Sequence, residues 1–160
     1  GSAHGFSGTT PVTAPGTYKA CAFAIGTSSF GAANSLLGCR TVIVPSAPVV
    51  GAFDSATVTQ GTSGNALDVR GWAVDPASPK APAYVDVYVD APSGITKGYR
   101  LLADEARSDI GQIFPQYGAA HGLSEVVPLT ERGKHVVCAF GIPVSPFGQS
   151  AAFGCRSITV

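Results

Sequence analysis

Four cysteines are the residues whose types and spacing most clearly indicate a chemistry. Cys21 and Cys39 are 18 residues apart, Cys138 and Cys155 are 17 residues apart, and 99 residues separate the two pairs. Nearly equal short spacings favour two equivalent local disulfides, Cys21 with Cys39 and Cys138 with Cys155, over buried free thiols. A zinc site is disfavoured because it needs close Cys-x-x-Cys or His spacings, which the sequence lacks. Disulfides imply an oxidising compartment.

Aromatic side chains offer a second chemistry, the binding of a sugar. Aromatic rings have flat apolar faces on which a sugar face can stack. For Trp72, the only tryptophan, we expect a place in the core rather than in such a site. The candidate ligand-facing residues are four tyrosines: Tyr84, Tyr88, Tyr99 and Tyr117.

The histidines do not form a catalytic pattern. His4 and His121 occupy equivalent places before a glycine, but no Ser, Cys or carboxylate accompanies both at matching spacing. His135 is replaced by Tyr18 in the equivalent position. We therefore expect structural hydrogen bonds from His121 and no catalytic residue, and we expect neither a metal nor a cofactor.

The charged residues also favour structural roles. Asp104 and Glu105 are adjacent, so on a strand they point to opposite faces and make a poor acid and base pair. Arg107 and Asp109 are expected to form a short-range pair or a helix cap, with ligand binding as the alternative. Asp75 precedes a proline and is expected to shape a turn, with a calcium ligand as the alternative.

The elements that position these residues belong to an internal repeat. Residues 1–36 align with 118–153 at an offset of 117, and one extra residue near Leu37 then aligns 38–44 with 154–160. The alignment contains 19 identities in 43 positions. A repeat period near 116 residues is typical of a sandwich domain rather than of a solenoid unit.

Hydrophobic periodicity predicts strands in the complete copy. The segment 84–90 reads YVDVYVD, and its strict alternation is that of a half-buried strand. A short helix is expected over 110–114, capped by Asp109 and ended by Pro115. The predicted strands number seven and cover 51–59, 66–74, 84–90, 95–104, 122–129, 135–142 and 153–160.

These strands predict an all-β fold, an immunoglobulin-like two-sheet β-sandwich. The expected organisation is the C-terminal part of a first repeat over 1–44, a linker over 45–48 and a complete repeat over 49–160. The first part should hold about three strands, one disulfide and an apolar face. We expect an upstream repeat or another protein chain to cover that face, formed by Phe6, Ala20, Cys21, Phe23, Ile25 and Val44.

Composition excludes several partners. Ten basic and ten acidic residues cancel, so the chain has no electrostatic reason to bind nucleic acid or an anionic membrane surface. No apolar run is long enough for a membrane span. The chain has 20 Gly, 12 Pro and 45% hydrophobic residues, which suits short strands joined by many turns.

A longer pattern resembles a repeat module of secreted actinobacterial cell-wall-associated proteins. It comprises Gly71–Pro76 (GWAVDP), Val85–Asp90 (VDVYVD), Arg107–Ile110, Pro115, Tyr117–Leu123 (YGAAHGL), Gly133–His135, Cys138 and Gly154–Arg156. Leu123 stands where the family has Phe, and Ala91 stands where it often has Gly. The resemblance covers the second copy, and its last third covers 1–44. It implies an immunoglobulin-like fold and an extracellular, secreted or cell-wall-associated place more than an activity.

Two functions follow as hypotheses. The first is a non-catalytic structural, adhesion or assembly module of an exported bacterial surface protein. The second is a module that binds cell-wall polysaccharide through the four tyrosines. Three aromatic side chains exposed in a row on one sheet face would favour the second hypothesis, and buried rings would favour the first.

Overall fold

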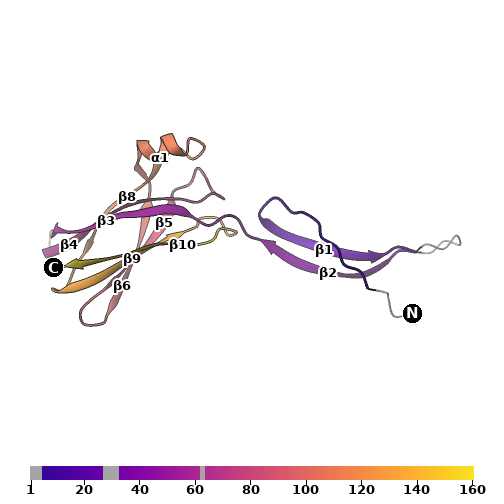
Figure 1. Cartoon of the computed structure of the whole chain (residues 1–160), viewed down its shortest axis with the longest axis horizontal. Coiled ribbons are helices and arrows are strands. Elements are labelled where there is room, and N and C mark those ends of the chain that lie inside the picture. The colour runs from indigo at the N-terminus through magenta and orange to yellow at the C-terminus, as the bar shows by residue number, and fades with distance from the viewer. Residues whose placement is uncertain (1–4, 27–32, 62–63) are drawn as a thin grey trace. The chain divides into compact units, whose positions relative to one another are not determined.

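The chain forms two compact units in a computed structural model that describes residues 5–26, 33–61 and 64–160. The first unit is Gly1–Pro45 and the second is Ser46–Val160. Figure 1 shows the strands of both units and the short helix of the second.

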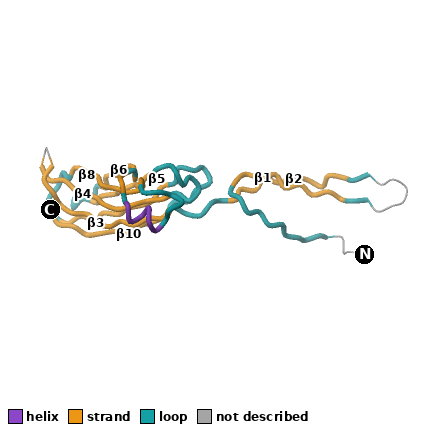
Figure 2. Tube along the Cα trace, turned by 90° about the horizontal axis from the view of Figure 1, so that it is seen from above, coloured by secondary structure: helices purple, strands orange, loops and turns teal. Residues whose placement is uncertain are grey.

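The first unit is a β-hairpin. Strands β1 (Gly16–Ala24) and β2 (Ser35–Val44) pair antiparallel, with Cys21 directly opposite Cys39. The predicted disulfide joins these two residues. Figure 2 shows the two strands as orange tubes that run beside each other.

The second unit is an all-β, immunoglobulin-like sandwich of two four-stranded sheets. One sheet has the order β10-β9-β5-β6 and the other has the order β3-β4-β8-β7. All seven predicted strands are present, and a short eighth strand, β7, was not predicted. The strands are β3 (Val50–Gly61), β4 (Gly64–Val74), β5 (Ala83–Asp90), β6 (Thr96–Ala103), β7 (Glu105–Ala106), β8 (Ala120–Pro128), β9 (Lys134–Ile142) and β10 (Ala151–Thr159).

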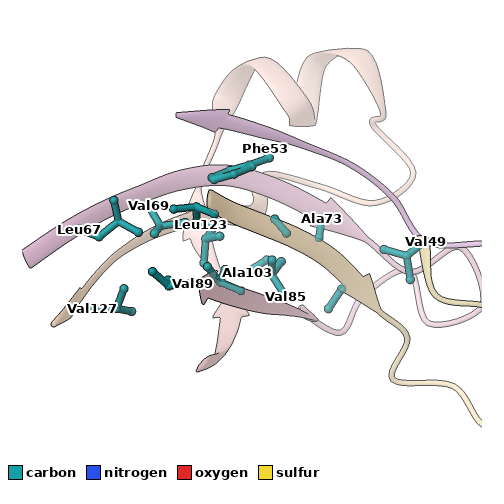
Figure 3. Close-up of a cluster of buried hydrophobic side chains, with 14 of the residues drawn as sticks. Val49, Phe53, Leu67, Val69, Ala73, Val85, Val89, Ala103, Leu123 and Val127 are labelled. Carbon is teal, nitrogen blue, oxygen red and sulfur yellow. The ribbon is translucent and has the colours of Figure 1, made fainter. Parts of the chain in front are cut away.

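The core lies between the two sheets and follows the alternation of each strand. On β5, Val85, Val87 and Val89 are buried, whereas Tyr84 and Tyr88 are exposed on the other face. Alternate side chains of a strand point to opposite faces, so one face supplies the core and the other meets solvent. Figure 3 shows the resulting cluster, in which Leu67, Val69 and Leu123 of the facing sheet meet the valines of β5.

The two copies share a β-bulge beside the disulfide. The pairing skips Leu37 on β2 and Phe153 on β10, in each case one residue before a glycine with positive φ. Gly154 has φ 103°, a conformation that side chains rarely adopt, which explains the glycine before the cysteine in both copies. The bulge also shows that the extra residue of the first copy lies in the connection before Ser35, and not near Leu37.

The helix α1 (Ser108–Ile113) begins earlier than predicted. Arg107 is its N-cap residue and no side chain caps it, so the expected cap by Asp109 is wrong. Asp109 instead lies in the first turn, where its negative charge meets the positive end of the helix dipole. Within the described residues, no helix has the length and apolar character that a membrane crossing requires.

Within its described residues the first copy forms two strands, whereas about three were predicted. Residues 5–11 align with residues 122–128 of β8, yet the structure shows no strand there, and Phe6 is 78% exposed. In the second unit, β8 pairs with β4, whereas the first copy has no segment that aligns with β4. A strand without a partner gains no ladder hydrogen bonds, which explains the difference.

Residues 46–48, expected to belong to a linker, are part of the second unit. Ser46 is 7% exposed, and its backbone N–H donates to the carbonyl oxygen of Phe147 over 2.8 Å. The side-chain amide of Gln149 donates to the carbonyl oxygen of Ser46 over 2.7 Å. Because these backbone groups are hydrogen-bonded to the sandwich, the segment packs as part of it and is not a linker.

Candidate functional site

The four candidate tyrosines do not form one platform. Tyr84 and Tyr88 share the outer face of β5, at 39% and 42% exposure. Tyr99 packs against the core, and its hydroxyl donates to the carbonyl oxygen of Pro128 over 3.0 Å. Burial accordingly raises the pKa of Tyr99 above its ordinary value. Tyr117 packs between Phe114 and His121 beside α1, away from the other three.

Phe140 adds a third ring to Tyr84 and Tyr88. Its partner across β5 and β9 is Asp86, which stands between the two tyrosines on the same face. The rings of Phe140 and Tyr88 are 5.8 Å apart, edge to face. Phe140 is half-buried, so the face carries two exposed rings and one partly covered ring. We call Tyr84, Asp86, Tyr88, Arg100 and Phe140 the aromatic face.

An ion pair lies at the centre of the aromatic face. Arg100 donates from Nε to Oδ1 of Asp86 and from Nη2 to Oδ2, each over 2.8 Å. The side-chain hydrogen bond to Asp86 raises the pKa of Arg100 above its ordinary value. The guanidinium carbon also lies 5.7 Å from the centre of the Tyr84 ring. A guanidinium group beside aromatic rings offers both hydrogen bonds and apolar contact to a ligand.

A shallow depression of ≈ 240 Å³ adjoins the ion pair, lined by Asp86, Tyr88, Gly98, Tyr99 and Arg100. Gly98 lies opposite Tyr88, and a Cβ there would come within 3.0 Å of the tyrosine ring. The glycine therefore lets the ring approach the neighbouring strand closely. The sequence pattern indicates the two tyrosines but not Phe140, Asp86 or Arg100, because only the strand register brings these residues together.

Arg107 and Asp109 form the predicted short-range pair. Arg107 forms two hydrogen bonds with the carboxylate of Asp109, of 2.8 and 2.7 Å, and a third of 2.7 Å with Asp54 on β3. Its side chain also donates to the carbonyl oxygen of Gly71. The hydrogen bond to Arg107 lowers the pKa of Asp109 to about 2, while both carboxylates raise the pKa of Arg107. The cluster joins α1 to two strands, and no signal in the sequence indicated Asp54.

Asp75 shapes the turn that its position before Pro76 predicted, and it does more. One carboxylate oxygen accepts from the backbone N–H of Ala77 over 2.9 Å. The other accepts from the N–H groups of Val144 and Ser145, each over 2.9 Å. Asp75 is fully buried, so these donors supply the hydrogen bonds that water would otherwise give.

Both described histidines are buried at 2% exposure. Nε2 of His121 lies 3.4 Å from the carbonyl oxygen of Tyr117, and Nδ1 has no partner among the described residues. The ring nitrogens of His135 each lie 3.1 Å from a carbonyl oxygen, of Asp90 and of Glu131. His4 lies outside the described residues.

Tyr18 reproduces one contact of His135. Its hydroxyl donates to the carbonyl oxygen of Ala14 over 2.8 Å, and Ala14 aligns with Glu131. Two different side chains thus bond the carbonyl oxygen four residues earlier in the two copies. This shared contact explains how a tyrosine replaces the histidine, since both anchor the turn before the strand.

Trp72 lies outside the main core, contrary to expectation. It is half-buried on the outer face of β4, and its ring centre lies 5.8 Å from that of Phe114. Leu67, Val69 and Ala73 form the core face of β4. Trp72 alternates with them along the strand and therefore points to the other face. Trp72 therefore belongs to a smaller cluster beside α1.

The hairpin of the first unit presents a second candidate surface. None of the described residues 5–26 and 33–45 is buried, and Phe23, Ile25 and Ile43 are 56%, 66% and 67% exposed. The expected apolar face is split, because Ala20 and Phe23 lie on opposite faces of β1. By alignment with β9, the face of Ala20, Ala22 and Ala24 corresponds to the core side.

Within the described residues, no group of three or more His, Cys, Asp or Glu side chains is arranged to hold a metal ion. The two disulfides indicate an oxidising, extracellular environment. Comparisons with protein-family models, with curated proteins and with solved structures find no match.

Proposed function

We propose that the chain is a non-catalytic structural module of an exported, secreted or cell-wall-associated bacterial protein, and that it acts in assembly through its first unit. One observation carries the proposal. The hairpin β1–β2 repeats the disulfide, the bulge and the pairing of β9–β10, yet none of its described residues is buried. A sequence that forms a core strand in one copy and is exposed in the other is suited to binding a complementary surface.

The environments of the polar residues support a non-catalytic role. His121 and His135 are buried, and Arg107 is held by two carboxylates. Asp75 is occupied by three backbone donors. General acid and base catalysis needs a titratable group within reach of a substrate, and these groups serve the fold instead.

The experiment is retention of the whole chain on purified cell walls, before and after their proteins are extracted. The Ala22→Asp variant places a charge on the core side of β1, and Thr41→Asp on the opposite face of β2 is the matched control. We expect wild type and Thr41→Asp to be retained only by walls that keep their proteins. We expect Ala22→Asp to lose roughly tenfold in retention. Equal retention of all three would contradict assembly through this face.

A catalytic role has its own test. The chain is incubated with wall material, and soluble sugars and peptides are measured over time. We expect no release above a boiled control. Release that a His121→Ala variant abolishes, while that variant keeps its fold, would show that the module is an enzyme.

The aromatic face favours a second candidate function, the binding of cell-wall polysaccharide. Tyr84 and Tyr88 are both exposed and share one sheet face with the Asp86–Arg100 pair. If this face binds sugars, the chain binds protein-free polysaccharide, and Tyr84→Ala with Tyr88→Ala removes that binding. Tyr117→Phe is the control, since Tyr117 packs between Phe114 and His121 beside α1 and is not part of the aromatic face. Binding that survives the double substitution would exclude the aromatic face.

A further inference from the structure

The side of β1 that faces away from β2, which we call the open edge, has a paired counterpart in the second unit. There β9 pairs with β10 on one side and with β5 on the other. Among the described residues, β1 pairs with β2 alone. We propose, on the basis of the assembly function above, that the open edge binds a β5-type strand from a β5–β6-type hairpin of another repeat of this class.

Backbone geometry sets the open edge up for pairing. The Cα atoms of Cys21 and Cys39 are 4.0 Å apart, which is the short spacing of a non-hydrogen-bonded antiparallel pair. In such a pair the N–H and C=O groups point away from the partner strand. The N–H and C=O of Cys21 therefore point to the open edge, as do those of Lys19, two residues away. Cys138 has the same short spacing to Cys155 and directs its groups to Tyr88 of β5.

The alignment fixes the register of the incoming strand. In the second unit Val85, Val87 and Val89 lie opposite Gly141, Ala139 and Val137. The aligned residues of β1 are Ala24, Ala22 and Ala20, so the incoming strand presents apolar side chains there. Small side chains at all three positions leave room for branched ones opposite them, as in β5 against β9.

Charge at one position supports the same occupant. Asp90 of β5 lies opposite Val136, and the residue aligned with Val136 is Lys19. An acidic residue at the Asp90 position of the incoming strand would lie directly across from Lys19. Opposite charges in direct cross-strand positions stabilise a pair of strands. The first copy is thus matched to a strand with valines alternating with polar residues and ending in Asp.

A second copy of this chain is a poor donor. Its β5 is already paired with β6 and β9, and Val85, Val87 and Val89 are at most 5% exposed. Donating β5 would open the donor's own core to fill the partner's edge, with no net gain in burial. The occupant is therefore a β5-type hairpin that has no β9 of its own.

The test uses the whole chain and a synthetic peptide with the sequence of residues 81–104, which spans β5 and β6. Hydrogen exchange is followed by NMR at the amides of Lys19 and Cys21. We expect the peptide to slow exchange at both amides by roughly tenfold or more. Lys19→Pro removes an N–H group that points to the open edge, and it breaks no hydrogen bond between β1 and β2. This variant should abolish the protection by the peptide. Lys19→Glu should weaken peptide binding roughly two- to fivefold.

A fusion keeps the test decisive if the free peptide binds weakly. Residues 46–117 are placed directly before Gly1, where the alignment expects them, so that linkage raises the effective concentration of the strand. We expect protection of Lys19 and Cys21 in the fusion and not in its Val85→Asp, Val87→Asp variant. The proposal is overturned if the amides of Lys19 and Cys21 stay unprotected both with the peptide and in the fusion. It is also overturned if the amide of Cys21 is protected equally in the Lys19→Pro variant.

The result is separable from the proposed function. If the open edge stays unprotected while Ala22→Asp still abolishes retention on walls, the first unit assembles through a different occupant. If the peptide protects the edge while wall retention ignores Ala22→Asp, the strand-binding edge exists but does not attach the protein to walls.

Discussion

Two regions of the molecule carry one sequence pattern in two environments. Leu123 of the second copy is 4% exposed in the core, and its counterpart Phe6 is 78% exposed. Both copies nevertheless keep the hairpin, the bulge and the disulfide. Contacts between neighbouring strands of the hairpin are specified locally, whereas the β8-type strand and the core need residues 49–117. The hairpin, its bulge and its disulfide therefore form without the rest of the sandwich, whereas the buried core requires the complete sandwich.

The largest contrast is expected between Leu123→Ala and Phe6→Ala. Leu123→Ala leaves a cavity in the core and should lower the free energy of unfolding of the second unit by about 2–5 kcal/mol. Phe6→Ala should change it by less than about 0.5 kcal/mol, because Phe6 is exposed and belongs to the other unit. Urea unfolding followed by Trp72 fluorescence reports the second unit alone, since Trp72 is the only tryptophan. Equal losses from both variants would show that Phe6 contributes to the stability of the second unit.

The two disulfides should differ next. Replacing Cys138 and Cys155 by serine should cost the second unit about 3 kcal/mol, the value of closing a loop of this length in the chain-entropy model. Replacing Cys21 and Cys39 should leave the Trp72 transition unchanged, because that disulfide lies in the first unit. A shift of the Trp72 transition by the Cys21 and Cys39 variant would contradict this expectation.

The smallest effect is an acid sensitivity confined to the second unit. Hydrogen bonding to Arg107 lowers the pKa of Asp109 to about 2, from an ordinary value of 3.8. A depressed carboxyl pKa stabilises the fold above the unfolded-state pKa, and the stabilisation is lost as the pH falls from about 4 to about 2. Asp109→Asn should therefore unfold at a temperature that falls less between pH 4 and pH 2. If the unfolding temperature of the variant had the same pH dependence as that of the wild type, Asp109 would not contribute to the acid sensitivity.

Much of the fold could be predicted because its signals are periodic and repeated. The alternation in YVDVYVD predicted β5, and the repeat predicted both disulfides. The failures have a common origin in contacts between distant segments. The strand expected over 5–12 needs a β4, Phe140 joins the tyrosines through the β5–β9 register, and Trp72 packs on α1 rather than in the core. A single sequence does not indicate which segments that are distant along the chain will pair or pack together in the fold.

The most direct test of the central claim compares amide hydrogen exchange in β1 and β9 of the same chain, without any partner. We expect slow exchange at Val136 and Cys138, whose backbone groups bond β5, and fast exchange at the aligned Lys19 and Cys21. Measuring both strands in one sample removes differences in pH and temperature. Equal protection of the two strands would show that the backbone groups on the open edge of β1 are already hydrogen-bonded within the chain, and would contradict the proposal that this edge is unpaired.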